Sequence, residues 1–189
     1  MKKTMLTLLF SLLALLALAV AFGFHRSAPL RNITLDNSVT IDGESSEVFA
    51  MVQYLENFPR WSPFLAEDPG QEYEVRGVDG TVGATYHWNG RGGKDIGYQK
   101  IVRIEPGEYL EMRCDIQKPF VAHPTFAYSF KNTPQGVRVS QRFTLESGAV
   151  DALFMWLFGA KAEMDATNKR GMELLKAAVE SAPAASMIR

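Results

Sequence analysis

The side chains that could perform chemistry are few and widely spaced. The three histidines, His25, His87 and His123, show neither HxH nor HExxH spacing, so a metal site would require carboxylates that only folding could bring to them. The single cysteine, Cys114, alternates with apolar residues, and burial lowers the reactivity of a thiol. One cysteine also excludes an intramolecular disulfide framework. We therefore expect no catalytic nucleophile, no metal site and no cofactor.

A glycine-rich loop and three acidic residues are weaker candidates. The loop, residues 90–94, reads Gly-Arg-Gly-Gly-Lys, lacks the GxxxxGK[ST] spacing and lies between two expected strands. A hairpin turn therefore explains this loop better than a phosphate site does. Glu72, Glu74 or Asp95 could belong to an acid–base pair, but their spacing favours none of them.

The composition is that of a globular protein. The 189 residues carry a formal net charge of -1, with 47% hydrophobic and 22% charged residues. This length suits one domain plus an appendage. The near-neutral charge argues against a broad nucleic-acid-binding face, so we expect no nucleic-acid partner.

The appendage is residues 1–26, an N-terminal transmembrane anchor or signal peptide. Lys2 and Lys3 precede an uncharged apolar run, residues 5–24, which as a helix is about 30 Å long and can cross a bilayer. We favour a single-pass anchor with the domain on the outer, periplasmic or extracellular, side. The alternative is a protein secreted after signal cleavage, for which Ala19-Val20-Ala21 supplies a small-x-small site.

The remaining chain predicts one α+β domain. We expect a linker over residues 27–37, the domain over 38–180 and a flexible tail over 181–189. A first strand is predicted at residues 38–41, and Ser45 is a plausible cap for a helix that ends near Leu55. Pro59 and Pro63 allow only a short second helix after it.

Alternating polar and apolar residues then predict antiparallel strands with one buried face. These segments are residues 71–76, 84–89, 97–105, 109–117, 125–131 and 137–146. A long helix over residues 149–180, capped by Ser147, carries an apolar stripe. We expect a curved antiparallel sheet of six or seven strands around this helix, with an apolar cavity between them.

These pieces resemble the START-like, or SRPBCC, superfamily, specifically its polyketide cyclase/dehydratase-like branch. The resemblance runs over residues 38–176. It rests on Leu-Glu-Asn-Phe-Pro-Arg-Trp-Ser-Pro-Phe at 55–64, Val-Gly-Ala-Thr-Tyr-His-Trp at 82–88 and Lys-Pro-Phe at 118–120. It implies the helix-grip fold, an apolar ligand cavity and, as in many relatives, a single N-terminal membrane helix. Gln141 departs from the pattern, because relatives often have tryptophan there, and the word cyclase in the family label is not evidence of catalysis.

Aromatic residues from separate elements would surround the cavity of such a fold. Gln141 and the tyrosine hydroxyls would orient a ligand, because a buried polar group needs a partner. For any one aromatic residue, an ordinary role in the core is the simpler interpretation. The cavity candidates are Trp61, Phe64, Tyr86, Trp88, Phe120, Phe126, Tyr128 and Gln141.

Residues 153–158 are all apolar and would cover every side of a helical turn. Phe154, Trp156 and Phe158 would close the cavity mouth or contact the membrane as a portal. Additional core packing is an equal alternative.

Three functions remain open. We favour an anchored or exported domain that binds a hydrophobic small molecule or lipid without catalysis. The second is a polyketide cyclase/dehydratase-like enzyme that acts on a hydrophobic substrate in the same cavity. The third is a structural or partner-binding domain with a filled core.

Overall fold

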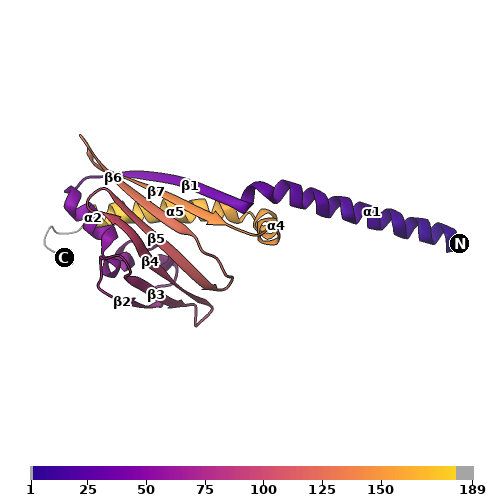
Figure 1. Cartoon of the computed structure of the whole chain (residues 1–189), viewed down its shortest axis with the longest axis horizontal. Coiled ribbons are helices and arrows are strands. Elements are labelled where there is room, and N and C mark those ends of the chain that lie inside the picture. The colour runs from indigo at the N-terminus through magenta and orange to yellow at the C-terminus, as the bar shows by residue number, and fades with distance from the viewer. Residues whose placement is uncertain (1, 182–189) are drawn as a thin grey trace.

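A long apolar helix, α1 (Lys2–Ser27), projects from one end of the molecule, well away from the strands (Figure 1). The computed structural model describes residues 2–181. The segment Thr4–Arg31 is long and apolar enough to cross a membrane, judged by length and composition. No part of its most apolar stretch is buried against the domain. A short 3-10 helix, η1 (Ala28–Arg31), joins α1 to the domain.

Seven strands form one antiparallel sheet in the order β1-β7-β6-β5-β4-β3-β2. This confirms the predicted α+β fold and its curved antiparallel sheet. The strands are β1 (Asn32–Ile41), β2 (Glu72–Arg76), β3 (Thr85–Gly90), β4 (Asp95–Glu105), β5 (Tyr109–Lys118), β6 (Thr125–Thr133) and β7 (Gly136–Glu146).

The first strand begins at Asn32 rather than at residue 38, so residues 32–37 are not linker. They pair with residues 141–146 of β7, which buries Ile33 and Leu35. The polar residues between and after them, such as Asp36 and Asn37, hide this strand in the sequence.

The expected short helices follow β1. They are α2 (Ser45–Gln53) and α3 (Pro63–Glu67), with the 3-10 helix η2 (Leu55–Arg60) between them. The Ser62 hydroxyl accepts a hydrogen bond from the Leu65 amide at the start of α3, while Glu44, not Ser45, is the N-cap residue of α2.

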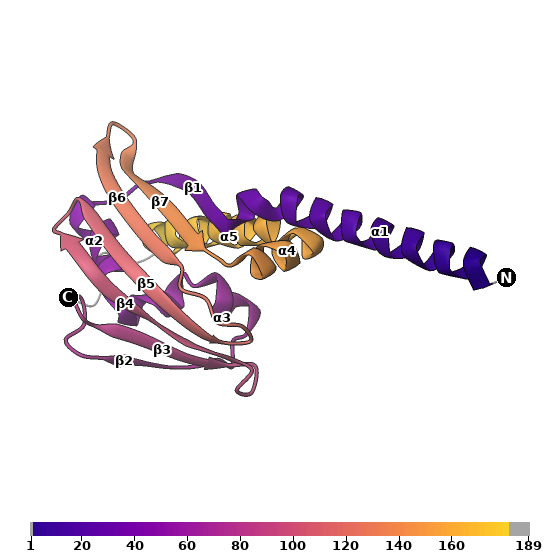
Figure 2. The same ribbon diagram turned by 45° about the vertical axis from the view of Figure 1, so that its right-hand side comes forward.

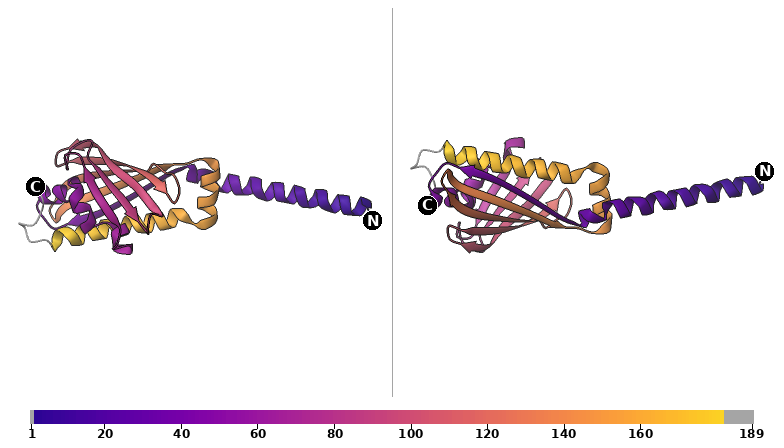
Figure 3. Two further views of the ribbon diagram at one scale, coloured as in Figure 1. Left: turned by 90° about the horizontal axis from the view of Figure 1, so that it is seen from below. Right: turned by 90° about the horizontal axis from the view of Figure 1, so that it is seen from above.

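The helix expected over residues 149–180 is two helices, α4 (Ala149–Phe158) and α5 (Ala160–Glu180). Gly159 lies between them with a φ of 68°, the left-handed conformation that ends many helices. Figure 3 shows α4 running across the end of the domain while α5 returns along one face of the sheet. The Ser147 hydroxyl does not cap α4 but donates to the Leu30 carbonyl oxygen. The expected tail lies outside the described residues except for Ser181.

Two apolar clusters hold the sheet to the helices. The larger one joins α2, the C-terminal half of α5 and the sheet, and includes Val48, Leu110 and Leu175. The smaller one, around Ile33 and Phe143, lies nearer α4 and includes partly buried Met155 and Met164. The inner face of the sheet, the face that α5 covers, is thus closed at the α2 end.

Candidate ligand-binding site

Polar side chains lie among the apolar residues of this inner face. Tyr86 of β3 is the register partner of Gln99 of β4, and both are buried. Gln141 of β7 is the register partner of Tyr128 of β6, and its Nε2 donates to the Tyr128 hydroxyl oxygen at 3.0 Å. The alternation of each strand positions these four side chains on the same face as the core.

Three of these polar atoms have no hydrogen-bond partner among the described residues. They are the Tyr86 hydroxyl, Gln99 Nε2 and Gln141 Oε1. A buried polar atom left unpaired costs about 1–3 kcal/mol, so a water or a ligand at these atoms would stabilise the fold.

The tyrosine hydroxyls of the inner face stay protonated at neutral pH. Burial, with a smaller contribution from Tyr73, raises the pKa of Tyr86 above its ordinary value. Burial also raises the pKa of Tyr128, against the lowering effect of its hydrogen bond with Gln141. Both groups therefore suit hydrogen bonding to a neutral ligand better than proton abstraction.

Exposure along the inner face increases towards the end that carries α1 and α4. Leu110 and Cys114 of β5 are buried whereas Ile116 is half-buried, and on β3 and β6 the half-buried residues are Trp88 and Phe126. Figure 2 shows these strand ends on the same side of the domain as α4. The inner face is therefore closed at the α2 end and partly exposed and apolar at the α4 end.

Trp88 is fixed at this partly exposed end. Its Nε1 donates to Asp95 Oδ1 at 2.9 Å. Across the strand pair stands Gly97, where an added Cβ would lie 2.5 Å from the Trp88 ring. The indole can lie over β4 only because Gly97 has no side chain. Trp88 thus offers a positioned apolar surface with a carboxylate at its edge.

The structure brings together most of the predicted site. Tyr86, Trp88, Phe126, Tyr128 and Gln141 share the inner face. Trp61 is buried beside them, with its ring centroid 6.1 Å from that of Tyr128 and its Nε1 donating to the Met51 carbonyl oxygen.

Phe64 and Phe120 do not join this group. Phe64 on α3 is 45% exposed and Phe120 in the β5–β6 connection is 63% exposed, so both lie at the surface. Sequence reasoning missed Gln99, because β4 has register irregularities at Ile96/Gly97 and Ile101/Arg103 that interrupt its alternation.

The portal candidates on α4 differ among themselves. Phe154 and Phe158 are exposed, and their rings are stacked with centroids 6.3 Å apart. Trp156 is half-buried, and its ring packs edge-on against Phe22 of α1 with a centroid distance of 6.5 Å.

The other chemically capable residues have structural surroundings. His87 stacks on Tyr98, and burial lowers its pKa. Burial raises the pKa of the Cys114 thiol to about 12. Among the described residues, no group of three or more His, Cys, Asp and Glu side chains could hold a metal ion.

The glycine-rich loop is a hairpin turn, as predicted. The Gly93 and Lys94 amides donate to the Gly90 carbonyl oxygen. The Arg91 amide donates to Asp68 Oδ2 at 2.7 Å, so a carboxylate already occupies this loop.

Two surface depressions lie away from the inner face. One of about 500 Å³ covers the outer face of β1, β7 and β6 and is bordered by Asp36, Arg138 and Arg142. The other, of about 340 Å³, lies where η1 meets Glu146 and Ser147. Of the predicted site residues, only Gln141 borders either one. Neither depression is the expected aromatic cavity.

A family model described as polyketide cyclase / dehydrase and lipid transport matches residues 32–180. The chain belongs to this family. The matched range begins with β1 and ends with α5, so it is the whole helix-grip domain without α1.

Solved structures share the family's fold at low identity. Protein CV1439 from Chromobacterium violaceum is 13% identical with a TM-score of 0.56, over 79% of this chain and 99% of that one. A protein from Arthrobacter aurescens is 18% identical with a TM-score of 0.58, over 80% of this chain and 87% of that one. The Aha1 dimer from Colwellia psychrerythraea is 13% identical with a TM-score of 0.55, over 79% of this chain and 97% of that one. No curated protein matches the chain.

Proposed function

We propose that this family member is a membrane-anchored domain that binds a hydrophobic small molecule or lipid between the inner face of its sheet and α5, without catalysing a reaction. α1 would be a single-pass anchor that holds the domain on the outer side of the membrane, with secretion after signal cleavage as the alternative. The family description, which includes lipid transport, supports the class of ligand.

One observation carries the proposal. The inner face of the sheet has apolar, half-buried side chains at one end and polar atoms without hydrogen-bond partners deeper inside. Half-buried Trp88, Ile116 and Phe126 offer apolar contact, and the Tyr86 hydroxyl and the Gln141 amide lie deeper on the same face. Binding sites for small molecules are mostly apolar with a few placed polar groups. This arrangement suits a molecule with an apolar body and a small polar group that enters first.

The same residues favour binding over catalysis. Because burial raises the pKa values of Tyr86 and Tyr128, both hydroxyls keep their protons at neutral pH. The Asp95 carboxylate at the rim already accepts the Trp88 indole hydrogen. An acid–base mechanism needs a group whose pKa lies near the working pH.

Binding can be measured with a fluorescently labelled fatty acid added to the full chain in phosphatidylcholine nanodiscs, with empty nanodiscs as the blank. We expect Trp88→Ala and Gln141→Leu each to weaken binding about tenfold, since each removes about 1.4 kcal/mol of contact or hydrogen bonding.

Gln135→Leu is the matched control, because Gln135 is exposed in the β6–β7 turn. Circular dichroism melting would show that the variants fold. Wild-type affinity in both folded variants would contradict the proposed site.

A further inference from the structure

The large exposed side chains of α4 are apolar and form one continuous face. Val150, Phe154, Leu157 and Phe158 follow the i, i+4, i+7, i+8 spacing of a single helix face, and all four are more than half exposed. Asp151, in the first turn, is the only charged residue of α4. It is exposed, and helical spacing places it at the border of this face, beside Phe154 and Phe158. In water, such a face would be an unfavourable surface on a folded domain.

A neighbouring side of α4, with Leu153 and Trp156, rests on the end of α1. The Gly23 backbone approaches Leu153 so closely that an added Cβ would lie 3.0 Å from Leu153 Cδ1. Phe22 packs against Trp156, and the Arg26 guanidinium lies over the Phe22 ring at 6.0 Å. α4 is therefore held at a fixed level along α1.

That level coincides with the end of the apolar run. The run ends at Phe24, and Phe22 lies two residues before it, or about 3 Å along the helix axis. Tryptophan and tyrosine concentrate at this depth in membrane proteins, at the boundary between acyl chains and headgroups, and an arginine near the end of a spanning helix extends its side chain to the same boundary. Trp156 and Arg26 are such residues, and both contact the Phe22 ring.

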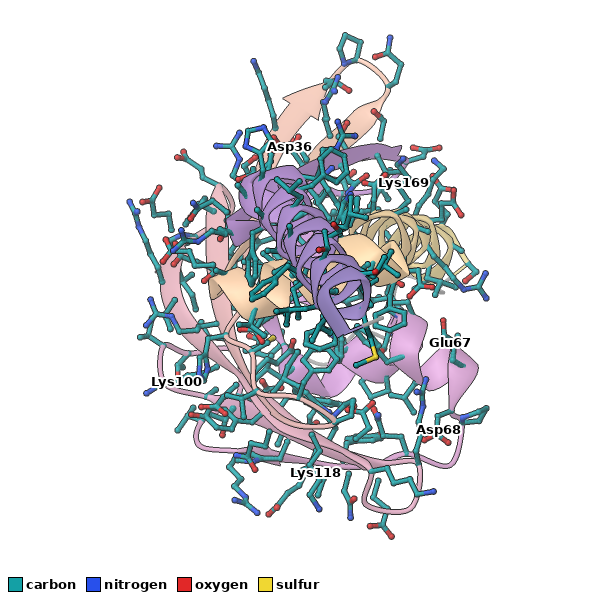
Figure 4. All side chains as sticks on the ribbon, turned by 90° about the vertical axis from the view of Figure 1, so that its right-hand side faces the viewer. Asp36, Glu67, Asp68, Lys100, Lys118 and Lys169 are labelled. Atoms are coloured by element: carbon teal, nitrogen blue, oxygen red, sulfur yellow. The ribbon has the colours of Figure 1, made fainter. Side chains whose placement is uncertain are left out.

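The direction of α4 fits this boundary. It runs across the direction of α1, whereas a helix in the hydrocarbon core would run along it (Figure 3). Seen from the α1 side, α4 lies close behind α1, and Glu67, Asp68 and Lys118 lie at the edge of the domain (Figure 4).

We propose that α4 lies in the plane of the membrane, with Val150, Phe154, Leu157 and Phe158 inserted among the phospholipids of the bilayer that α1 crosses. The inference rests on the anchoring role proposed for α1. An in-plane apolar helix docked on a spanning helix needs a lipid surface at that level, and the bilayer supplies one.

This placement gives the ligand a route. The partly exposed end of the inner face lies on the α4 side of the domain, as does the β5–β6 connection with exposed Phe120 and Val121 (Figure 2). A hydrophobic molecule could then pass from the bilayer to the inner face without crossing water.

Spin labelling of the full chain in phosphatidylcholine vesicles tests the depth of α4. Labels attached to Phe154→Cys and Phe158→Cys would be compared with labels at Leu13→Cys in α1 and Val78→Cys in the β2–β3 turn. Val78 is the matched control, because it is as exposed as Phe158, 73% each, and its turn lies at the end away from α1. Cys114 is replaced by alanine throughout.

The readout is the ratio of label collisions with oxygen, which concentrates in lipid, to collisions with a water-soluble nickel chelate. We expect this ratio at positions 154 and 158 to shift from the Val78 value towards the Leu13 value. A Val78-like ratio at both positions, with a lipid-like ratio at Leu13, would overturn the inference and leave the anchor intact. Water-like ratios at all positions would overturn both. Labels at 154 and 158 that meet neither reagent would show a protein partner on this face and also overturn the inference.

Discussion

At the scale of single residues, the inner face changes from closed to partly exposed within one strand. Cys114 of β5 is buried, two residues before half-buried Ile116, and its sulfur lies 4.0 Å from Gln99 Oε1. The thiol therefore reports how far water reaches into the proposed site.

We predict that Cys114 does not react with a water-soluble aromatic disulfide at pH 8 in the folded protein, because burial raises its pKa to about 12 and leaves almost no thiolate. The thiol should react fully once urea unfolds the chain. Absorbance of the released thiolate measures both reactions. Rapid reaction of the folded protein would contradict the prediction, because it would show that the inner face is open to water as far as Cys114.

Alternation with a period of two was sufficient to predict Tyr86, Trp88, Phe126, Tyr128 and Gln141 on one face, because strand geometry alone decides that placement. It failed for Gln99, where β4 is irregular. It gave no information on Phe64 and Phe120, since a short helix and a loop carry no such periodicity and only the folded chain shows that both are exposed.

At the scale of elements, the break at Gly159 decides where α4 can lie. A continuous helix from Ala149 to Glu180 would follow α5 and carry the apolar face of α4 away from α1. The apolar stripe in the sequence continues through Gly159, so the pattern predicted one helix. The left-handed backbone conformation of Gly159 ends α4.

We predict that Gly159→Ala lowers the free energy of unfolding by about 1 kcal/mol, because φ at this position is 68° and a Cβ disfavours that conformation. Gly159→Asn should cost less, since asparagine tolerates the left-handed region. Urea unfolding of the full chain in detergent measures both changes.

Gly70→Ala is a suitable control, because Gly70 is exposed and its nearest neighbour to an added Cβ is 3.8 Å away. An alanine variant at position 159 as stable as the wild type would mean that the left-handed turn does not constrain the junction of α4 and α5.

At the scale of the whole molecule, the two ends of the domain differ. The end with α2 is closed by the larger apolar cluster, whereas the end with α1 and α4 has half-buried strand residues and exposed aromatic residues. The order of strands and helices could be predicted from polarity patterns, because each element needs one apolar face. The difference between the closed and the partly exposed end of the domain could not be predicted in this way, since it depends on tertiary packing between β1, α4 and α1.

The central claim is that the inner face holds a hydrophobic ligand. Native mass spectrometry of the full chain, extracted from its host membrane in mild detergent, tests this most directly. We predict a mass that exceeds the polypeptide by one hydrophobic molecule, and loss of that excess in Trp88→Ala. The polypeptide mass alone, in a protein that also fails to take up the labelled fatty acid, would contradict the claim.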